Sequence, residues 1–169
     1  MLISEIKFNA SECAKFLNVC EKSVQTWCSN GALIARKDPH TSTWIIKGRN
    51  LATFLYYNPR YQHYLRTRYL VGAMAEKQKI ILANVDSRPF LYHLPLLCDI
   101  FNVNPDTVKY WIKRERIKPL KRRGVYGADL FTEEAVQDFL AHTSTSYYQQ
   151  RFKMFKEGEH ESVSNLYPD

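Results

Sequence analysis

Polar and basic side chains recur at the spacing of one helix face in two segments of the chain. They are Lys22, Gln25, Thr26 and Ser29 in the first segment and Asp106, Lys109, Tyr110, Lys113 and Arg114 in the second. Side chains of these types on an exposed helix hydrogen-bond base edges in the major groove of DNA, as lysine does with guanine and glutamine with adenine. A helix that faces only solvent has a similar composition, so the surrounding elements must decide between the two interpretations.

Each segment also carries three apolar side chains at positions i, i+3 and i+4, on the opposite face of the same helix. They are Val24, Trp27 and Cys28 in the first segment and Val108, Trp111 and Ile112 in the second. We expect these side chains to be buried. The polar and basic set is then left on the exposed side of both helices.

The two segments belong to a longer repeat, because Ala10–Leu55 recurs as Leu94–Leu140. The recurring residues are Asn18-Val19 as Asn102-Val103, Val24 as Val108, Trp27 as Trp111, Lys37 as Lys121, and, after a slip of one residue, Phe54-Leu55 as Phe139-Leu140. Apolar positions are kept even where the residue changes. An internal duplication predicts two modules of the same architecture.

In the first copy, Asn9 and Glu12 have the spacing of a capping box, which predicts a helix from Ala10 to about Leu17. Asn18 follows where the chain must turn, and asparagine tolerates the left-handed conformation. A second helix is expected to begin near Glu21.

In the second copy, Asn104 and Pro105 predict the start of the second helix, with Asp106 in its first turn. The first helix of this copy has no polar cap in the sequence, because Pro95 directly follows Leu94. Where the first copy has Gly31 the second has Glu115, so its second helix is expected to stop differently or to run longer.

A β-hairpin is predicted after the second helix of each copy. In the first copy its strands are Leu33–Arg36 and Trp44–Ile46, and in the second they are Pro119–Arg123 and Leu130–Phe131. The basic residues of the two hairpins are Arg36, Lys37, Lys121, Arg122 and Arg123. They are placed to contact phosphates or a narrow minor groove beside the helix. Basic residues also protect an exposed sheet edge from pairing, which is the alternative reading.

Each copy resembles the winged helix-turn-helix domain of MerR-type regulators and of phage or plasmid excisionases. The resemblance is carried by Asn18-Val19, Trp27 and Gly31–Arg36 in the first copy and by their counterparts around Trp111 in the second. It implies sequence-specific binding of duplex DNA, with the second helix in the major groove and the wing on the backbone or minor groove. Ordinary MerR-type regulators carry one such domain and a dimerising coiled coil, whereas this chain carries two copies.

The expected fold is mainly α-helical with small β-hairpin wings, in two tandem winged helix-turn-helix modules. The modules are residues 1–57 and 85–142; residues 58–84 form a helical connector, predicted as one long helix, and residues 143–169 form a short helix and an acidic disordered tail. Tyr147–Phe152 is similar to Arg60–Leu65, so each repeat is expected to end in an extra helix.

The four cysteines, Cys13, Cys20, Cys28 and Cys98, contain no Cys-x-x-Cys pair. Three of them align with an apolar residue or alanine in the other copy, so we expect small buried side chains, with no metal, disulfide or cofactor. The five histidines are scattered, and no Gly-rich phosphate loop or His-Glu-x-x-His motif occurs. We therefore expect no enzymatic activity.

The net charge of +7 suits a polyanionic partner, since lysine and arginine release counterions from phosphates. No apolar run is long enough for a membrane span, and Met1–Phe8 lacks the features of a signal peptide, so we expect a cytoplasmic, nucleoid-associated protein.

The sequence thus predicts a protein that binds double-stranded DNA sequence-specifically, as a transcriptional regulator of phage, plasmid or mobile-element type. Two alternatives stay open: an excisionase-like factor that bends DNA for recombination, or a protein in which one module has become a protein-interaction domain. A second copy of the chain, a recombinase or RNA polymerase could be a further partner.

Overall fold

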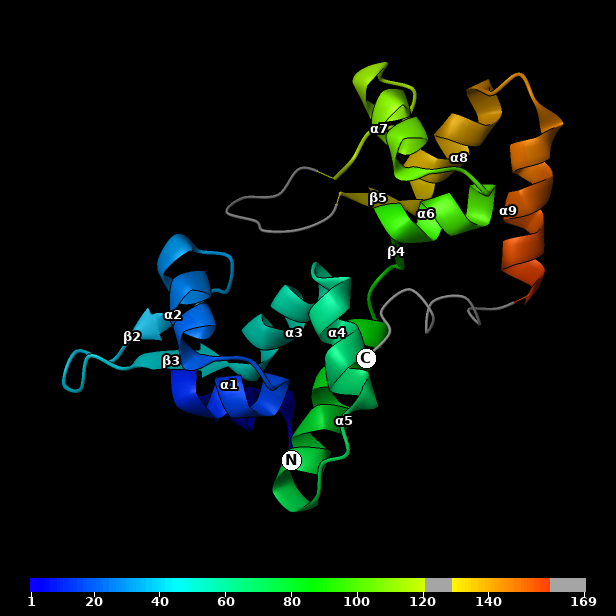
Figure 1. Ribbon diagram of the computed structural model, residues 1–169. Helices are drawn as coiled ribbons and strands as arrows, with labels where there is room; N and C mark the ends of the chain where they lie inside the picture. Colours follow the sequence, from blue (N-terminus) through cyan, green and yellow to red (C-terminus); the bar gives the residue numbers. More distant parts are fainter. Residues whose placement is uncertain (121–128, 159–169) are drawn as a thin grey trace. The chain divides into compact units, whose positions relative to one another are not determined.

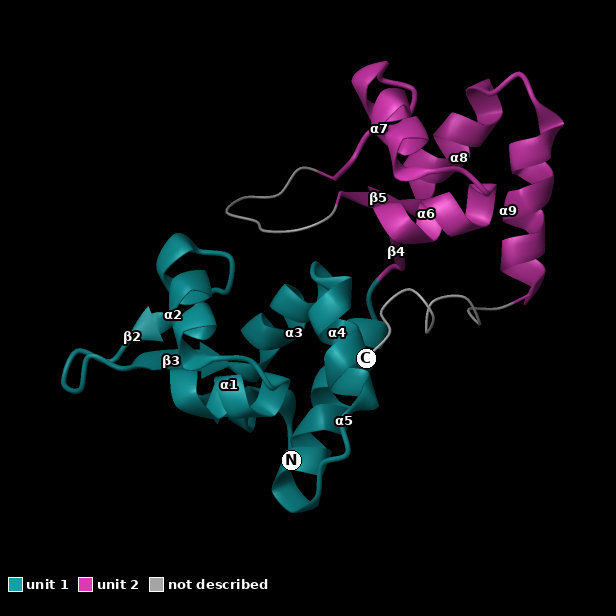
Figure 2. Cartoon of the chain, viewed as in Figure 1, with its two compact units in different colours: residues 1–88, 122–127 teal, residues 89–121, 128–169 magenta. Residues whose placement is uncertain are grey.

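A computed structural model of the chain describes residues 1–120 and 129–158 (Figure 1). The described residues form two compact units, residues 1–88 and residues 89–120 with 129–158 (Figure 2). Both units are mainly helical and contain a small antiparallel sheet, as expected for the fold class. Among the described helices, none has the length and apolar character to cross a membrane.

Unit 1 contains a three-stranded sheet and five α-helices. Its elements are the 3-10 helix η1 (Ile3–Glu5), β1 (Lys7–Phe8), α1 (Ala10–Leu17), α2 (Glu21–Asn30), β2 (Arg36–Lys37), β3 (Trp44–Lys47), α3 (Gly48–Tyr56), α4 (Pro59–Thr67) and α5 (Gly72–Asp86). The strand order is β1-β3-β2, with Phe8 opposite Ile46 and Lys37 opposite Trp44.

In its described residues, unit 2 repeats the beginning of this order around a two-stranded sheet. Its elements are β4 (Leu91–His93), α6 (Leu94–Phe101), α7 (Pro105–Lys113), β5 (Leu130–Thr132), α8 (Glu133–His142) and α9 (Ser146–Gly158). Tyr92 pairs with Phe131, as Phe8 pairs with Ile46 in unit 1. The first strand of each unit, β1 and β4, was missed in the sequence, because two or three residues show no periodicity.

The first helix of unit 1 begins at the predicted capping box. The Glu12 backbone N–H donates to Asn9 Oδ1 at 2.8 Å, and the Asn9 N–H donates to Glu12 Oε1 at 2.9 Å. The helix ends at Asn18, whose φ of 57° is left-handed, and Val19 N–H then donates to Ala14 O at 2.9 Å. Asn102 ends α6 in the same way, with φ 53°.

The first helix of unit 2 has a polar cap after all, and it is His93. The Leu96 backbone N–H donates to His93 Nδ1 at 3.2 Å, so the imidazole takes the place that Asn9 holds in unit 1. His93 is 2% exposed, and this burial lowers its pKa from 6.5 to about 4. A neutral ring accepts the hydrogen bond, whereas a protonated ring has only donors.

Unit 2 is therefore expected to lose stability in mild acid. Because the folded state holds the pKa of His93 below its unfolded value, the unfolded chain binds the proton first as the pH falls. The contribution of neutral His93 to the free energy of unfolding is complete above pH 6.5, and about 3 kcal/mol of it is lost by pH 4. Urea unfolding across this pH range would measure the loss. In His93→Asn, which keeps a capping oxygen, this component should disappear; an identical pH dependence in both proteins would contradict it.

The second helices of the two units end at corresponding left-handed residues of different type. Gly31, with φ 82°, follows α2, and Glu115, with φ 55°, follows α7. Leu33 N–H donates to Trp27 O at 3.0 Å, and Arg116 N–H donates to Trp111 O at 2.8 Å. Helix α7 thus ends close to where α2 ends instead of running longer, and Glu115 occupies a conformation that favours glycine.

Substitutions at positions 115 and 31 should change the stabilities of the two units in opposite directions. Glu115→Gly is expected to stabilise unit 2 by about 1 kcal/mol, because glycine has no penalty at positive φ. Gly31→Ala is expected to destabilise unit 1 by about 1 kcal/mol through backbone strain alone, since no atom lies within 4 Å of the added Cβ. Thermal unfolding of both variants checks the pair; a shift of the same sign in both would contradict it.

The core of each unit contains the same trio of aromatic rings. In unit 1 the Trp27 ring lies 4.7 Å from Phe54 and 4.9 Å from Tyr61, measured between centroids. In unit 2 the Trp111 ring lies 4.5 Å from Phe139 and 5.2 Å from Tyr148. The interplanar angle of each tryptophan with its phenylalanine is 35°. The two tryptophans therefore have matching surroundings.

The third ring of each trio comes from a helix beyond the repeated segment, α4 in unit 1 and α9 in unit 2. Gln62 and Gln149, which follow these tyrosines, donate to Leu55 O at 3.3 Å and to Leu140 O at 3.0 Å. The prediction of an extra helix after each repeat is confirmed. The tail, residues 159–169, lies outside the described residues.

The expectation of one long connecting helix is wrong, because the chain turns between α4 and α5. Gln78 Nε2 donates to Leu65 O at 2.6 Å and to Arg68 O at 2.9 Å, which satisfies carbonyls at the end of α4. The turn returns α5 onto α3 and buries Ile81 and Val85. Residues 58–84 thus pack within unit 1.

An arginine caps the end of the first helix in both units. Arg68 donates to Lys15 O at 2.5 Å and Phe16 O at 3.1 Å. Arg151 donates to the corresponding carbonyls, Asp99 O at 3.0 Å and Ile100 O at 2.9 Å. The two arginines reach the same place from different positions, one from the α4–α5 turn and one from within α9.

Candidate nucleic-acid interface

The exposed face of α2 carries the four residues predicted for it. Lys22, Gln25, Thr26 and Ser29 are exposed. Val24, Trp27 and Cys28 are buried on the opposite face. The Thr26 hydroxyl donates to Lys22 O at 2.9 Å and so lies close to the helix backbone. The helix therefore presents short polar groups and one lysine to its surroundings.

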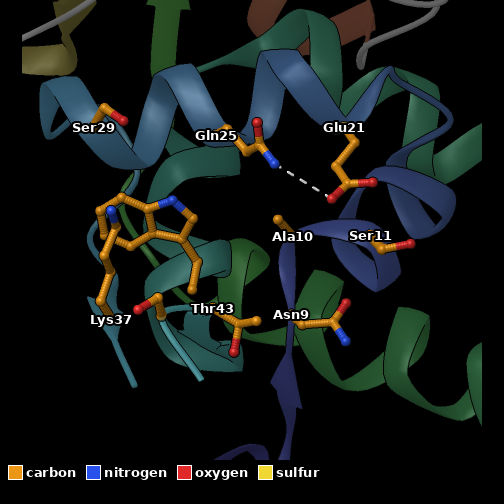
Figure 3. Close-up of a pocket in the computed structure, with 10 residues that line it drawn as sticks. Asn9, Ala10, Ser11, Glu21, Gln25, Ser29, Lys37 and Thr43 are labelled. Carbon is orange, nitrogen blue, oxygen red and sulfur yellow. Dashed lines mark hydrogen bonds between the residues drawn. The ribbon is translucent and has the colours of Figure 1, made fainter. Parts of the chain in front are cut away.

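An open groove of about 480 Å³ runs beside α2 (Figure 3). Glu21, Gln25 and Ser29 lie along its α2 side, and Asn9 and Thr43 lie on the other side. Its remaining lining residues are Ala10, Ser11, Lys37, Ser42 and Trp44. The groove thus separates the second helix from the hairpin and from the start of α1.

Glu21 is a groove residue that the sequence did not single out. Gln25 Nε2 donates to Glu21 Oε1 at 3.4 Å, which turns the amide nitrogen towards the carboxylate (Figure 3). A carboxylate in a major groove accepts a hydrogen bond from the cytosine amino group. The position of Glu21 in the first turn of α2, on the side of Gln25, could have indicated from the sequence that it belongs to this face.

The hairpin of unit 1 is present, but its first strand is shorter than predicted. Only Arg36 and Lys37 form β2, because Leu33 is fully buried and tied to the end of α2. Arg36 and Lys37 are exposed, and the Lys37 ammonium lies 5.2 Å from the centre of the Trp44 ring. This cation–π contact holds the Lys37 charge on the hairpin, at the edge of the groove.

The exposed face of α7 is more basic than that of α2. Asp106, Lys109, Tyr110, Lys113 and Arg114 are all exposed, as predicted. Val108 and Trp111 are buried opposite them, whereas Ile112 is only half-buried. The Thr107 N–H donates to Asn104 Oδ1 at 3.0 Å, which confirms the predicted cap. The face brings three cations and one aromatic ring to the surface.

Two further basic residues, Arg116 and Lys118, follow α7 and are exposed. They were not predicted from the sequence, although their alternation with Glu115 and Ile117 was a possible signal. The predicted hairpin residues Lys121, Arg122 and Arg123 lie outside the described residues. Pro119 and Leu120, the described part of the predicted first strand, are not in a strand, although Leu120 N–H donates to Leu130 O at 2.6 Å. The residues predicted for the second strand, Leu130 and Phe131, lie in β5, which pairs with β4.

The cysteines only partly follow expectation. Cys13 and Cys28 are buried, and desolvation raises their pKa values to about 12 and about 11. Cys98 is half-buried, and Cys20 is exposed at the start of α2, where its Sγ lies 3.0 Å from Ser23 Oγ. The expectation of a buried side chain, made for the three cysteines with an apolar counterpart, is met by Cys13 and Cys28 and only partly by Cys98. Within the described ranges, no three His, Cys, Asp or Glu side chains gather as metal ligands.

Both units thus expose a polar or basic helix face opposite a buried Val–Trp pair. No family model, curated protein or solved structure matches the chain. The function must therefore be argued from these two helices, the hairpin beside α2 and the charges around them.

Proposed function

We propose that the protein binds double-stranded DNA sequence-specifically through two winged helix-turn-helix modules, as a transcriptional regulator of phage, plasmid or mobile-element type. The observation that carries the proposal is the paired exposure of α2 and α7. Each presents polar and basic side chains on the face opposite its buried tryptophan. An α-helix fits the major groove, where such side chains read base edges.

The surroundings of the two helices support the same proposal. A left-handed asparagine, Asn18 or Asn102, makes the turn that leads into each helix. In unit 1, Arg36 and Lys37 lie on a hairpin across a groove from α2. Cations at this position can contact the phosphate backbone while the helix occupies the major groove.

The two modules are proposed to read different sequences. Unit 1 offers Glu21, Lys22 and Gln25, whereas unit 2 offers Lys109 and Lys113 with aromatic and arginine neighbours. Because both modules share one chain, binding of the first makes binding of the second intramolecular, so two weak contacts produce tight binding. The target is therefore an asymmetric site with two unlike halves.

Selection of duplexes from a random DNA pool with the full chain tests the proposal. Enrichment of a site with two different half-sequences is the expected result. Competition with unrelated duplex in excess then measures the specificity ratio. If no sequence is enriched and the chain has no affinity for duplex DNA at low salt, the proposal is wrong.

A protein-interaction role for unit 1 is the second candidate, favoured by the Glu21 carboxylate in its groove and by the single lysine on α2. In that case the selected site would contain only the half read by unit 2. Replacing Lys22 and Gln25 by alanine would then leave DNA affinity unchanged.

A further inference from the structure

Tyr110, Arg114 and Arg116 gather at the end of α7. The guanidinium carbon of Arg114 lies 5.4 Å from the centre of the Tyr110 ring, and that of Arg116 lies 5.7 Å from it. All three side chains are exposed, Tyr110 to 45%. Among the described residues, neither guanidinium forms an ion pair. Two unneutralised cations are therefore held beside one aromatic ring.

The backbone fixes the starting points of both arginines. The N–H groups of Arg114, Glu115 and Arg116 donate to Tyr110 O at 2.9 Å, Ile112 O at 3.0 Å and Trp111 O at 2.8 Å. Each of the three residues is thus tied to the last turn of α7. The left-handed φ of Glu115 reverses the chain between the two arginines, so both side chains reach the same ring.

Unit 1 has none of these three side chains. The residues at the corresponding positions are Thr26, Asn30 and Ala32. Helix α2 forms the same turn and the same aromatic packing without these side chains. Tyr110 and the two arginines are therefore not needed for the first and second helices of a unit to fold. This comparison points to a binding role that is specific to unit 2.

We propose that Tyr110, Arg114 and Arg116 form a clamp for one phosphate of the DNA backbone at the C-terminal end of α7; this rests on the proposed function. A planar guanidinium donates two parallel hydrogen bonds to phosphate oxygens. Contact with the Tyr110 ring restricts both guanidiniums before binding, which lowers the entropy cost of ordering them.

The position of the two arginines at the C-terminal end of α7 favours contact with a phosphate over contact with a base. Residues on the exposed face of a recognition helix reach base edges, whereas Arg114 and Arg116 follow the last residue of α7, Lys113, and so lie closer to the backbone. The negative end of the helix dipole repels an anion at a C-terminus, so a phosphate bound there needs compensating cations. Arg114 and Arg116 supply two of them. Tyr110 acts as a positioning residue that holds the two guanidiniums.

The test measures affinity of the full chain for the selected duplex and for a scrambled duplex over a series of KCl concentrations. R114A/R116A is expected to weaken binding to both duplexes by about tenfold and to reduce the slope of log K against log salt by about 1. Y110A should weaken binding about two- to fivefold, as expected for an exposed cation–π contact. Y110F keeps the ring and should bind like the unmodified chain.

K79A/K153A is the matched control, because it removes two exposed charges from α5 and α9 and should leave the slope unchanged. A loss with R114A/R116A that is confined to the selected duplex, at constant slope, would show base reading and overturn the clamp. Equal losses in Y110F and Y110A would overturn the positioning role of the ring. If the unmodified chain binds neither duplex, the proposed function itself fails, and this is visible before any variant is compared.

Discussion

Raising the salt concentration from 50 to 200 mM is expected to weaken binding to the selected duplex by about 10³- to 10⁵-fold. This range follows if about six to ten phosphates are neutralised by lysine and arginine, because each contact releases condensed counterions. The two units expose enough cations for that number, including Lys22, Arg36 and Lys37 in unit 1 and Lys109 and Lys113 in unit 2. Fluorescence anisotropy of a labelled duplex measures the affinity at each salt concentration.

The same titration separates contacts that read bases from contacts that only attract phosphate. K109A/K113A is expected to weaken binding to the selected duplex by about 10- to 100-fold and to change binding to scrambled DNA much less. K22A/Q25A should relax the preference for the other half of the site. An affinity that does not depend on salt, or a K109A/K113A variant no weaker than the charge-matched K79A/K153A, would contradict the assignment of α7 as a recognition helix.

Replacing either core tryptophan by alanine is expected to destabilise its own unit by about 3–5 kcal/mol. Trp27 and Trp111 are only 6% and 4% exposed, and each packs against a phenylalanine and a tyrosine of its trio. A loss of this size approaches the whole stability of a small domain, so the affected unit should unfold. Hydrogen exchange followed by mass spectrometry reports the protection of each unit separately.

In W27A, peptides of residues 1–88 should lose protection while peptides of unit 2 keep it, and W111A should show the reverse. Trp→Phe at each position keeps an aromatic ring and serves as the milder control. Full protection of the mutated unit in W27A or W111A would mean that these rings do not hold the cores together.

Local signals made much of the fold predictable from the sequence. The capping box at Asn9 and the Asn104-Pro105 pair placed the starts of α1 and α7 within a residue, because caps satisfy helix N–H groups with nearby side chains. The i, i+3, i+4 spacing of apolar residues identified the buried faces of both second helices, with Ile112 only half-buried.

Features that depend on distant partners were missed. The break between α4 and α5 is supported by Gln78 and by the contact of Arg68 with α1, which is far away in the sequence. His93 was not recognised as a cap in the sequence. Its ring accepts a hydrogen bond only while it is neutral, and burial keeps it neutral here.

Some features of the candidate site could likewise be predicted from the sequence, and others could not. Exposure of the α2 and α7 side chains followed from periodicity, since it is a property of one helix. The groove beside α2 and the contact of Arg116 with Tyr110 depend on how the chain folds back after each helix. No pattern within a single helix contains that information.

The arginine caps and the third aromatic rings determine where the chain can be cut to give two folded fragments. A fragment ending at residue 57 would lack Tyr61 and Arg68, and one ending at residue 142 would lack Tyr148 and Arg151. Each truncated piece would leave a tryptophan partly uncovered and two helix-end carbonyls without their guanidinium. Self-sufficient halves for NMR or crystallisation should therefore extend through α5 in the first case and through α9 in the second.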